Sequence, residues 1–216
     1  MTVSTQDLRE LPNIANLRRL TRSLAMLDAI VSPEWDYRYY SFNSNWADSE
    51  MMASMRNGSG DHWFALFCLD GVALHGLAHE APSYRPGEPW PGIFDRLPTQ
   101  FHANVLREPA FSTEHSTFCI WRLVTEERWS SGPVALPPGS DPDGSANLLA
   151  ILAGRPEQYL EYARDYFERD LDLDDVRAVY AHRPLDAALV ERLNPEVQLD
   201  ALAEDIAQIG YPEGAG

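Results

Sequence analysis

The sequence predicts an α+β fold, and three patterns along the chain lead to this prediction. In residues 14–31 apolar side chains recur every three or four positions, as on one side of an amphipathic helix. In the middle of the chain two apolar runs flank Asp70-Gly71, which is typical of an antiparallel β-hairpin. From residue 145 onward, helical patterns follow one another, separated by glycine and proline.

We therefore expect an N-terminal amphipathic helix, a central mostly antiparallel sheet covered on both faces, and a C-terminal helical region. The length of 216 residues suits one domain that buries roughly 70% of its unfolded surface. Within this single domain, residues 1–140 would form the helix and the sheet. Residues 141–216 would form an all-helical extension packed on them.

The first helix should end at Ser32-Pro33, because a residue that precedes proline is driven out of the helical region. The aromatic stretch 35–42 favours a strand. Residues 47–56 carry three methionines and predict a short helix that Asn57-Gly58 would close.

The hairpin is the clearest local signal. A two-residue turn at Asp70-Gly71 would make Leu69 face Val72 and would fix the pairing of the whole hairpin. The side chains on both faces of the hairpin are largely apolar, so both faces should be covered.

The remaining elements follow in order. Residues 81–100 are rich in proline and glycine and predict an ordered surface loop. Residues 118–124 predict a buried strand that returns through 133–136 as a second hairpin. The final helices are expected at 145–153, 156–168, 173–181, 185–193 and 199–209.

Composition excludes several chemistries. The chain has 17 arginines and no lysine, a bias typical of GC-rich bacterial coding, so Schiff bases, lysine nucleophiles and phosphate loops that end in Gly-Lys are impossible. Its formal net charge of −16 disfavours nucleic acid and anionic membranes and favours a basic protein partner. No apolar stretch approaches the length of a membrane span.

The N-terminal residues do not resemble a secretion signal, and a cytoplasmic protein is expected. Cys68 and Cys119 both lie in apolar runs, which predicts buried and reduced side chains. The oligomeric state cannot be read from the sequence.

Histidines give the only candidate metal site. His75 and His79 are four positions apart, but on a strand this spacing of about 13 Å is too long for one metal ion, and His75 is expected to be buried with a hydrogen-bond partner. In the predicted register His62 instead faces His79, close enough for two imidazoles to share a divalent ion or a proton.

Carboxylates near this pair could complete such a site. Asp61 and Glu80 would oppose each other one rung further out but would point to the other face. The missing ligand would then come from elsewhere, such as Glu50 on the preceding helix. An ordinary polar hairpin end explains these residues better than a functional site does, and we expect no resident cofactor unless a divalent metal binds here.

Two further features bear on function. The aromatic residues between Trp35 and Trp46 either line a ligand pocket or pack in the core. The acidic run 170–175 suits a helix start and could also face a basic partner.

With no catalytic motif in the sequence, we expect a non-enzymatic protein-binding module of the immunity-protein type, the bacterial proteins that neutralise toxins by binding them. The alternative is a metal-assisted hydrolase or a small-ligand-binding enzyme that uses His62 and His79.

Overall fold

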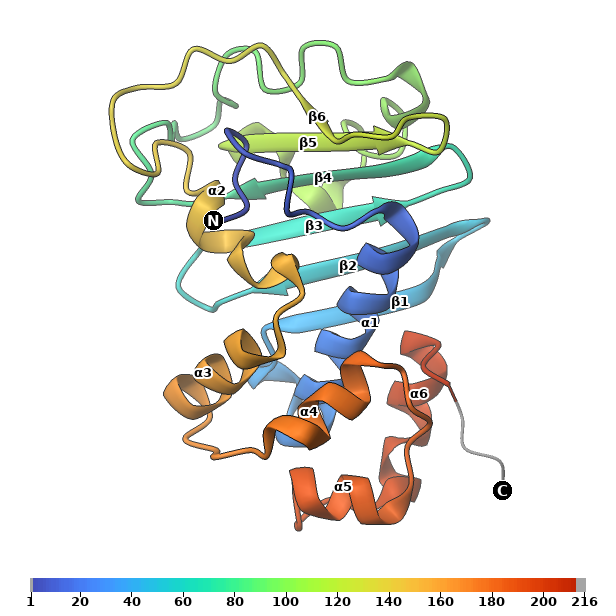
Figure 1. Cartoon of the computed structure of the whole chain (residues 1–216). Coiled ribbons are helices and arrows are strands. Elements are labelled where there is room, and N and C mark those ends of the chain that lie inside the picture. The colour runs from blue at the N-terminus through green and yellow to red at the C-terminus, as the bar shows by residue number, and fades with distance from the viewer. Residues whose placement is uncertain (1, 213–216) are drawn as a thin grey trace.

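The computed structural model describes residues 2–212 and confirms the predicted α+β fold. An N-terminal helix, a six-stranded antiparallel sheet and a group of C-terminal helices make up the molecule (Figure 1). The strands lie side by side in chain order, β1-β2-β3-β4-β5-β6. Their bounds are β1 Tyr40–Ala47, β2 Glu50–Arg56, β3 His62–Phe67, β4 Gly71–Leu77, β5 Phe118–Leu123 and β6 Ser130–Ser131.

Helix α1, Ile14–Val31, has the limits that the sequence predicts. At its start the side chain of Asn13 accepts a hydrogen bond from the backbone N–H of Asn16, at 2.9 Å. At its end Ser32 adopts an extended conformation before Pro33.

The C-terminal helices are also confirmed, with some of their turns tightened to 3-10 geometry. The α-helices are α2 Ser145–Leu148, α3 Pro156–Tyr166, α4 Leu173–Tyr180, α5 Ala187–Leu193 and α6 Ala203–Ile209. The 3-10 helices are Trp35–Tyr37, Thr99–Phe101, Pro109–Phe111, Thr113–His115, Ala150–Ala153 and Leu199–Leu202.

The predicted Met-rich helix at residues 47–56 is wrong, because this segment forms a turn and then strand β2. Met52 and Met55 pack in two different apolar clusters on opposite faces of the sheet. The backbone of β2 is paired with β1 on one edge and with β3 on the other. This pairing outweighs the helical preference of methionine, which is a weak local bias.

Two other strands differ from the prediction, one displaced along the chain and the other shortened. The segment 35–42 begins with a 3-10 turn, and β1 starts only at Tyr40, where the carboxylate of Asp28 accepts the backbone N–H. The second hairpin is reduced to the two residues of β6. Pro133 and the prolines that follow it have no N–H to donate, so the ladder cannot continue along this edge.

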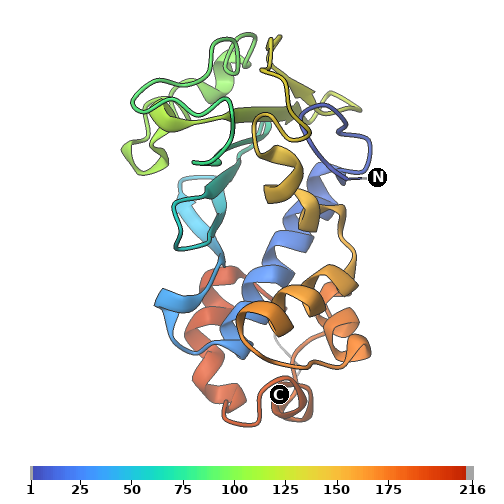
Figure 2. The same ribbon diagram turned by 90° about the vertical axis from the view of Figure 1, so that its left-hand side faces the viewer.

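The central strands separate two apolar clusters. Ala65 and Phe67 of β3 pack in a cluster with α1, whereas Phe64 and Leu66 pack with side chains of residues 93–111. Figure 2 shows α1 on one side of these strands and the long β4–β5 connection on the other. Every residue of β4 is buried, as the sequence predicts for a central strand.

The C-terminal helices gather beyond β1 at one edge of the sheet (Figure 1). Their apolar side chains belong to the same cluster as α1 and the start of β1, so helices and sheet share one core. Within residues 2–212 no helix has both the length and the apolar character that a bilayer crossing requires.

Candidate functional site

The β3–β4 hairpin exists as predicted, but its register is wrong. Phe67 pairs with Val72, and the Cys68 N–H donates to the carbonyl of Gly71 at 2.9 Å. The turn is therefore formed by Leu69 and Asp70, one residue earlier than the sequence predicts. The shift changes every pair along the two strands but preserves which side chains share a face, because the side-chain period of a strand is two.

The close approach of β5 explains the shift. Gly71 pairs with Leu123, and a Cβ atom at Gly71 would lie 2.2 Å from the carbonyl oxygen of Arg122. Only glycine allows the two backbones to come this near. Gly71 is thus part of β4, and the turn forms without it.

His62 and His79 consequently do not face each other. His62 pairs with Leu77, and the ring of His79 bonds to Asp61, with 2.7 Å between Nδ1 and Oδ1. The opposed histidine pair is a wrong prediction, and so is the pairing of Asp61 with Glu80. The predicted metal site loses its geometric basis.

Asp61 and His79 instead form a hydrogen-bonded pair at the open end of the hairpin. The carboxylate also accepts the His79 N–H at 2.9 Å and a proton of the Asn57 side-chain amide at 2.9 Å. Burial alone would raise the pKa of Asp61, but these hydrogen bonds outweigh it and lower the pKa. The network closes the β2–β3 connection and fixes Asn57.

The remaining carboxylates of the predicted site lie elsewhere. Glu50 is the first residue of β2, six residues and therefore about 20 Å from Arg56, which pairs with His62. Its carboxylate accepts a hydrogen bond from Asn104, and Glu80 is exposed. Among residues 2–212 no group of three or more His, Cys, Asp and Glu side chains is arranged to hold a metal ion.

His75 is buried with a hydrogen-bond partner, as predicted. Its exposed fraction is 1%, and 3.0 Å separate Nδ1 from the Ser116 hydroxyl oxygen. Nε2 has no partner in the described part of the chain, and Phe64 and Phe111 pack on the ring. Burial lowers the pKa of His75 to about 3, so the ring is neutral at ordinary pH.

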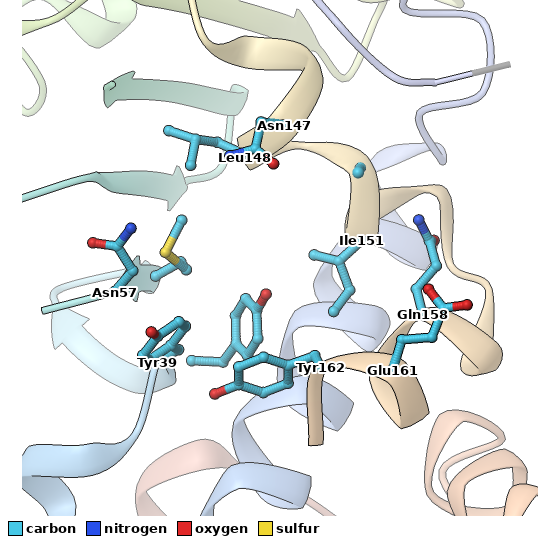
Figure 3. A pocket seen from close by; sticks show the side chains of 11 residues that line it. Tyr39, Asn57, Asn147, Leu148, Ile151, Gln158, Glu161 and Tyr162 are labelled. Atoms are coloured by element: carbon cyan, nitrogen blue, oxygen red, sulfur yellow. The ribbon is translucent and has the colours of Figure 1, made fainter. Parts of the chain in front are cut away.

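A cleft of about 320 Å³ opens between the start of β1, the end of β2, and helices α2 and α3 (Figure 3). Three tyrosines line it, Tyr39, Tyr40 and Tyr162. Figure 3 shows Tyr39 and Asn57 on one side of the opening, with Gln158 and Glu161 on the other. The sequence did not decide whether the aromatic residues between Trp35 and Trp46 line a pocket or pack in the core. In the structure Tyr39 and Tyr40 line the cleft, whereas Phe42 packs in the core.

A buried carboxylate anchors the tyrosines of this cleft. Asp28 is completely buried, and its Oδ2 accepts the backbone N–H groups of Tyr39 and Tyr40, each at 2.9 Å. The hydroxyls of Tyr159 and Tyr162 donate to the same carboxylate at 2.8 and 3.2 Å. Burial raises the pKa of Asp28 to about 7, although these four hydrogen bonds act in the opposite direction.

Sequence reasoning missed Asp28, which falls largely off the apolar stripe of the helix. Yet all residues from Leu24 to Val31 are buried. One feature of the sequence could have indicated this burial. The last part of the helix is apolar on every side, which is typical of a buried helix and not of an amphipathic one. A carboxylate inside such a segment needs several donors, and here α3 and the start of β1 supply them.

The opposite side of the cleft holds polar groups without partners. Within residues 2–212 the carboxylate of Glu161 forms no hydrogen bond or ion pair. Oε1 of Gln158 is buried and likewise has no donor among the described residues. The oxygens of both side chains can accept hydrogen bonds, and none of the arginines in the described residues lines the cleft.

An exposed aromatic patch adjoins the cleft, and we define it as Trp35, Tyr37, Tyr39 and Tyr166. Trp35, Tyr37 and Tyr166 are 52%, 57% and 39% exposed, which is unusual for large aromatic side chains. The rings of Tyr39 and Tyr166 lie 4.1 Å apart, and Tyr162 joins them to the cleft. Tyr39, Tyr162 and Tyr166 thus connect the patch to the cleft, whereas the Trp35 ring faces the guanidinium of Arg38, 5.7 Å from the ring centroid.

Negative charge is concentrated in the C-terminal third of the chain, which includes helix α3 of the cleft. Residues 145–216 contain 15 acidic residues and six arginines, against 18 and 11 in the twice longer segment 1–144. Glu34 and Asp36 flank the exposed Trp35 and are themselves exposed. A partner that binds the aromatic patch therefore meets a negative field.

A second hollow, of about 590 Å³, lies between residues 5–11 and 127–129. Arg9 and Asp7 line it and neutralise each other through two hydrogen bonds of 2.8 and 2.7 Å. Its other charges are Arg122, Arg128 and Glu127, so neither sign dominates. This hollow offers weaker grounds for a site than the aromatic cleft.

Compared with protein-family models, curated proteins and solved structures, the chain matches none of them. The fold and the site define an α+β protein with an aromatic cleft in an acidic surface. Its function has to be argued from that surface.

Proposed function

We propose that this chain is a non-enzymatic protein-binding module of the immunity-protein type, which holds a basic protein partner on its acidic aromatic surface. The observation that carries the proposal is the aromatic patch, in which three large side chains are exposed next to a cleft. Tyrosine and tryptophan are the residues most enriched where proteins bind one another.

The charges around the patch indicate the kind of partner. The net charge of −16 and the acidic helices repel anionic ligands and attract basic ones. Glu34, Asp36 and Glu161 form no ion pair with any other residue in the described range 2–212, so they are available to a cationic partner. Aromatic rings also bind arginine and lysine side chains through cation–π contacts.

The catalytic alternative has no comparable support. It depended on His62 and His79 facing each other, and that pairing is wrong. Asp61 and His79 are close, but neither lines one of the clefts described above.

The proposal can be tested by capture on the immobilised protein. A basic partner should bind at low salt and elute as the salt rises to about 0.5 M, where screening limits exposed charges to a reach of a few ångströms. Trp35→Ala together with Tyr166→Ala should weaken capture by about thirtyfold or more, since interface aromatics of this kind contribute ~1–2 kcal/mol each.

The matched control is Leu69→Ala together with Val124→Ala. These two side chains are 78% and 61% exposed, so the control removes apolar surface of similar exposure. They lie at the opposite end of β3 and β4 from the cleft, and capture should be unchanged. Capture that resists salt and the patch substitutions, or a partner that is acidic, would contradict the proposal.

A further inference from the structure

We infer that the cleft between β1, β2 and helices α2 and α3 is a socket for a single arginine side chain of the basic partner. The inference rests on the proposed function and specifies what the partner presents. Three properties of the cleft support it, namely its apolar floor, its tyrosine rings and its unpartnered acceptors.

The floor suits the aliphatic stem of a long cationic side chain. Met55, Leu148 and Ile151 line the middle of the cleft, and each of them is otherwise buried. Arginine and lysine bury their methylene groups along such surfaces while the charged end finds a polar site. A volume of about 320 Å³ is ample for one side chain and too small for a folded element.

The tyrosine rings favour a cation in this space. Tyr39, Tyr40 and Tyr162 present aromatic groups to the cleft, and no arginine of the chain lines it. The negative face of an aromatic ring attracts a cation, most strongly when water is excluded. The rings are held in place because Asp28 accepts the backbone N–H groups of Tyr39 and Tyr40 and the hydroxyl of Tyr162.

The acceptors distinguish a guanidinium from an ammonium group. Gln158 and Glu161 are three residues apart on α3, so their side chains lie next to each other on the helix surface, as Figure 3 shows. A buried acceptor without a donor is unfavourable, and here a carboxylate without a partner lies beside it. The planar guanidinium has five donors in a fixed fork and can satisfy both acceptors at once.

The aromatic patch explains why the arginine would belong to a protein. Tyr39 is part of both the cleft and the patch, so a chain that places an arginine in the cleft also covers the exposed Tyr166. A free amino acid would leave that surface exposed.

The test uses three small probes on the full chain: the N-acetyl methylamides of arginine, of citrulline, which is its neutral isostere, and of lysine. Binding is followed by NMR on protein with labelled tyrosine rings. Arginine amide should shift the ring signals of Tyr39, Tyr40 and Tyr162 with a millimolar Kd, whereas citrulline amide should bind at least about tenfold more weakly.

Glu161→Gln should weaken arginine binding by about five- to tenfold, because it removes the carboxylate but not the shape of the cleft. Glu191→Gln is the matched control, since it makes the same charge change at an exposed position on α5. Its effect should stay within about twofold, as expected for a screened distant charge.

Equal binding of arginine and citrulline amides, tighter binding of lysine amide, or equal effects of the two glutamate substitutions would each overturn the inference. Its failure can be told apart from failure of the proposed function. If Glu161→Gln leaves partner capture intact while the Trp35 and Tyr166 substitutions abolish it, the surface binds a partner without an arginine in the cleft.

Discussion

Two buried titratable groups, Asp28 and His75, are expected to oppose each other in the pH dependence of stability. Both are at most 1% exposed, and neither forms an ion pair. The pKa of one is raised by burial and that of the other is lowered, so protons affect the folded state in opposite directions. Removing either group should reveal the contribution of the other.

The contribution of His75 to the free energy of unfolding is lost as the pH falls. The pKa is about 3 in the folded protein and 6.5 in an unfolded chain, so between these values the unfolded state binds the extra proton. Going from pH 8 to pH 5 should therefore lower the free energy of unfolding by about 2 kcal/mol through this residue.

The contribution of Asp28 to the free energy of unfolding is gained as the pH falls over the same range. Its pKa is about 7 in the folded protein and 3.8 in the unfolded chain, so the folded state binds the extra proton below pH 7. From pH 8 to pH 5 this residue should raise the free energy of unfolding by about 2.5 kcal/mol, and the gain is lost again as the pH rises through 7. The two contributions nearly cancel in the native protein.

The substitutions Asp28→Asn and His75→Leu separate the two contributions to the free energy of unfolding. Asparagine keeps an acceptor for the backbone N–H groups of Tyr39 and Tyr40 and can donate to the hydroxyl of Tyr159. Leucine fills the space of His75 and leaves one hydroxyl, that of Ser116, without its partner. Urea unfolding at pH 8, 7, 6 and 5 gives the free energy of unfolding of each variant relative to the native protein at the same pH.

Between pH 8 and pH 5, Asp28→Asn should lose about 2.5 kcal/mol relative to the native protein, and His75→Leu should gain about 2 kcal/mol. The comparison at equal pH removes the effect of the other carboxylates, which titrate in all three proteins. Difference profiles that are flat, or that slope in the same direction for both variants, would refute the reasoning.

Two further predictions concern the hairpin and the cysteines. Gly71→Ala should lower the free energy of unfolding by about 2 kcal/mol or more, because its Cβ would lie 2.2 Å from the Arg122 carbonyl oxygen. Gly58→Ala meets no atom within 4 Å, so urea unfolding should show only the strain of its positive φ, about 1 kcal/mol, and equal losses would argue against the close approach. Cys119 is buried with its pKa raised and should resist thiol reagents until unfolding, whereas Cys68 is only partly buried and should react first. Equal labelling rates under native conditions would contradict this order.

The fold class was predictable because it depends on backbone periodicity. The three- and four-residue spacing in α1 and the period of two in β3 and β4 are visible in the sequence. The faces of the hairpin were also predicted correctly. Moving the turn by one residue shifts each residue's partner by two positions, which keeps every side chain on the same face. Cys119 is buried as predicted, but Cys68 is only partly buried, so the expected burial of both thiols is wrong for Cys68.

The candidate site was largely beyond the reach of the sequence. Its walls come from residues 39–40, 55–57, 147–151 and 158–162, which only the packed fold brings together. Tyr39 and Tyr40 were recognised as possible pocket residues, but nothing local indicated that Glu161 would lie across from them. The His62–His79 pair failed because the turn forms at Leu69 and Asp70, one residue earlier than the local turn rule predicts, and this shifts every pair of the hairpin.

The sequence by itself determined which residues alternate between faces, where the first helix begins and ends, and which chemistry the absence of lysine excludes. Those properties follow from local geometry and composition, which each segment carries with it. Only the tertiary structure decided that residues 50–56 pair as a strand, that Gly71 belongs to β4, and that Asp28 is buried among tyrosines. These outcomes depend on partners distant in the chain, and packing selects such partners because it must fill space and satisfy every buried polar group together.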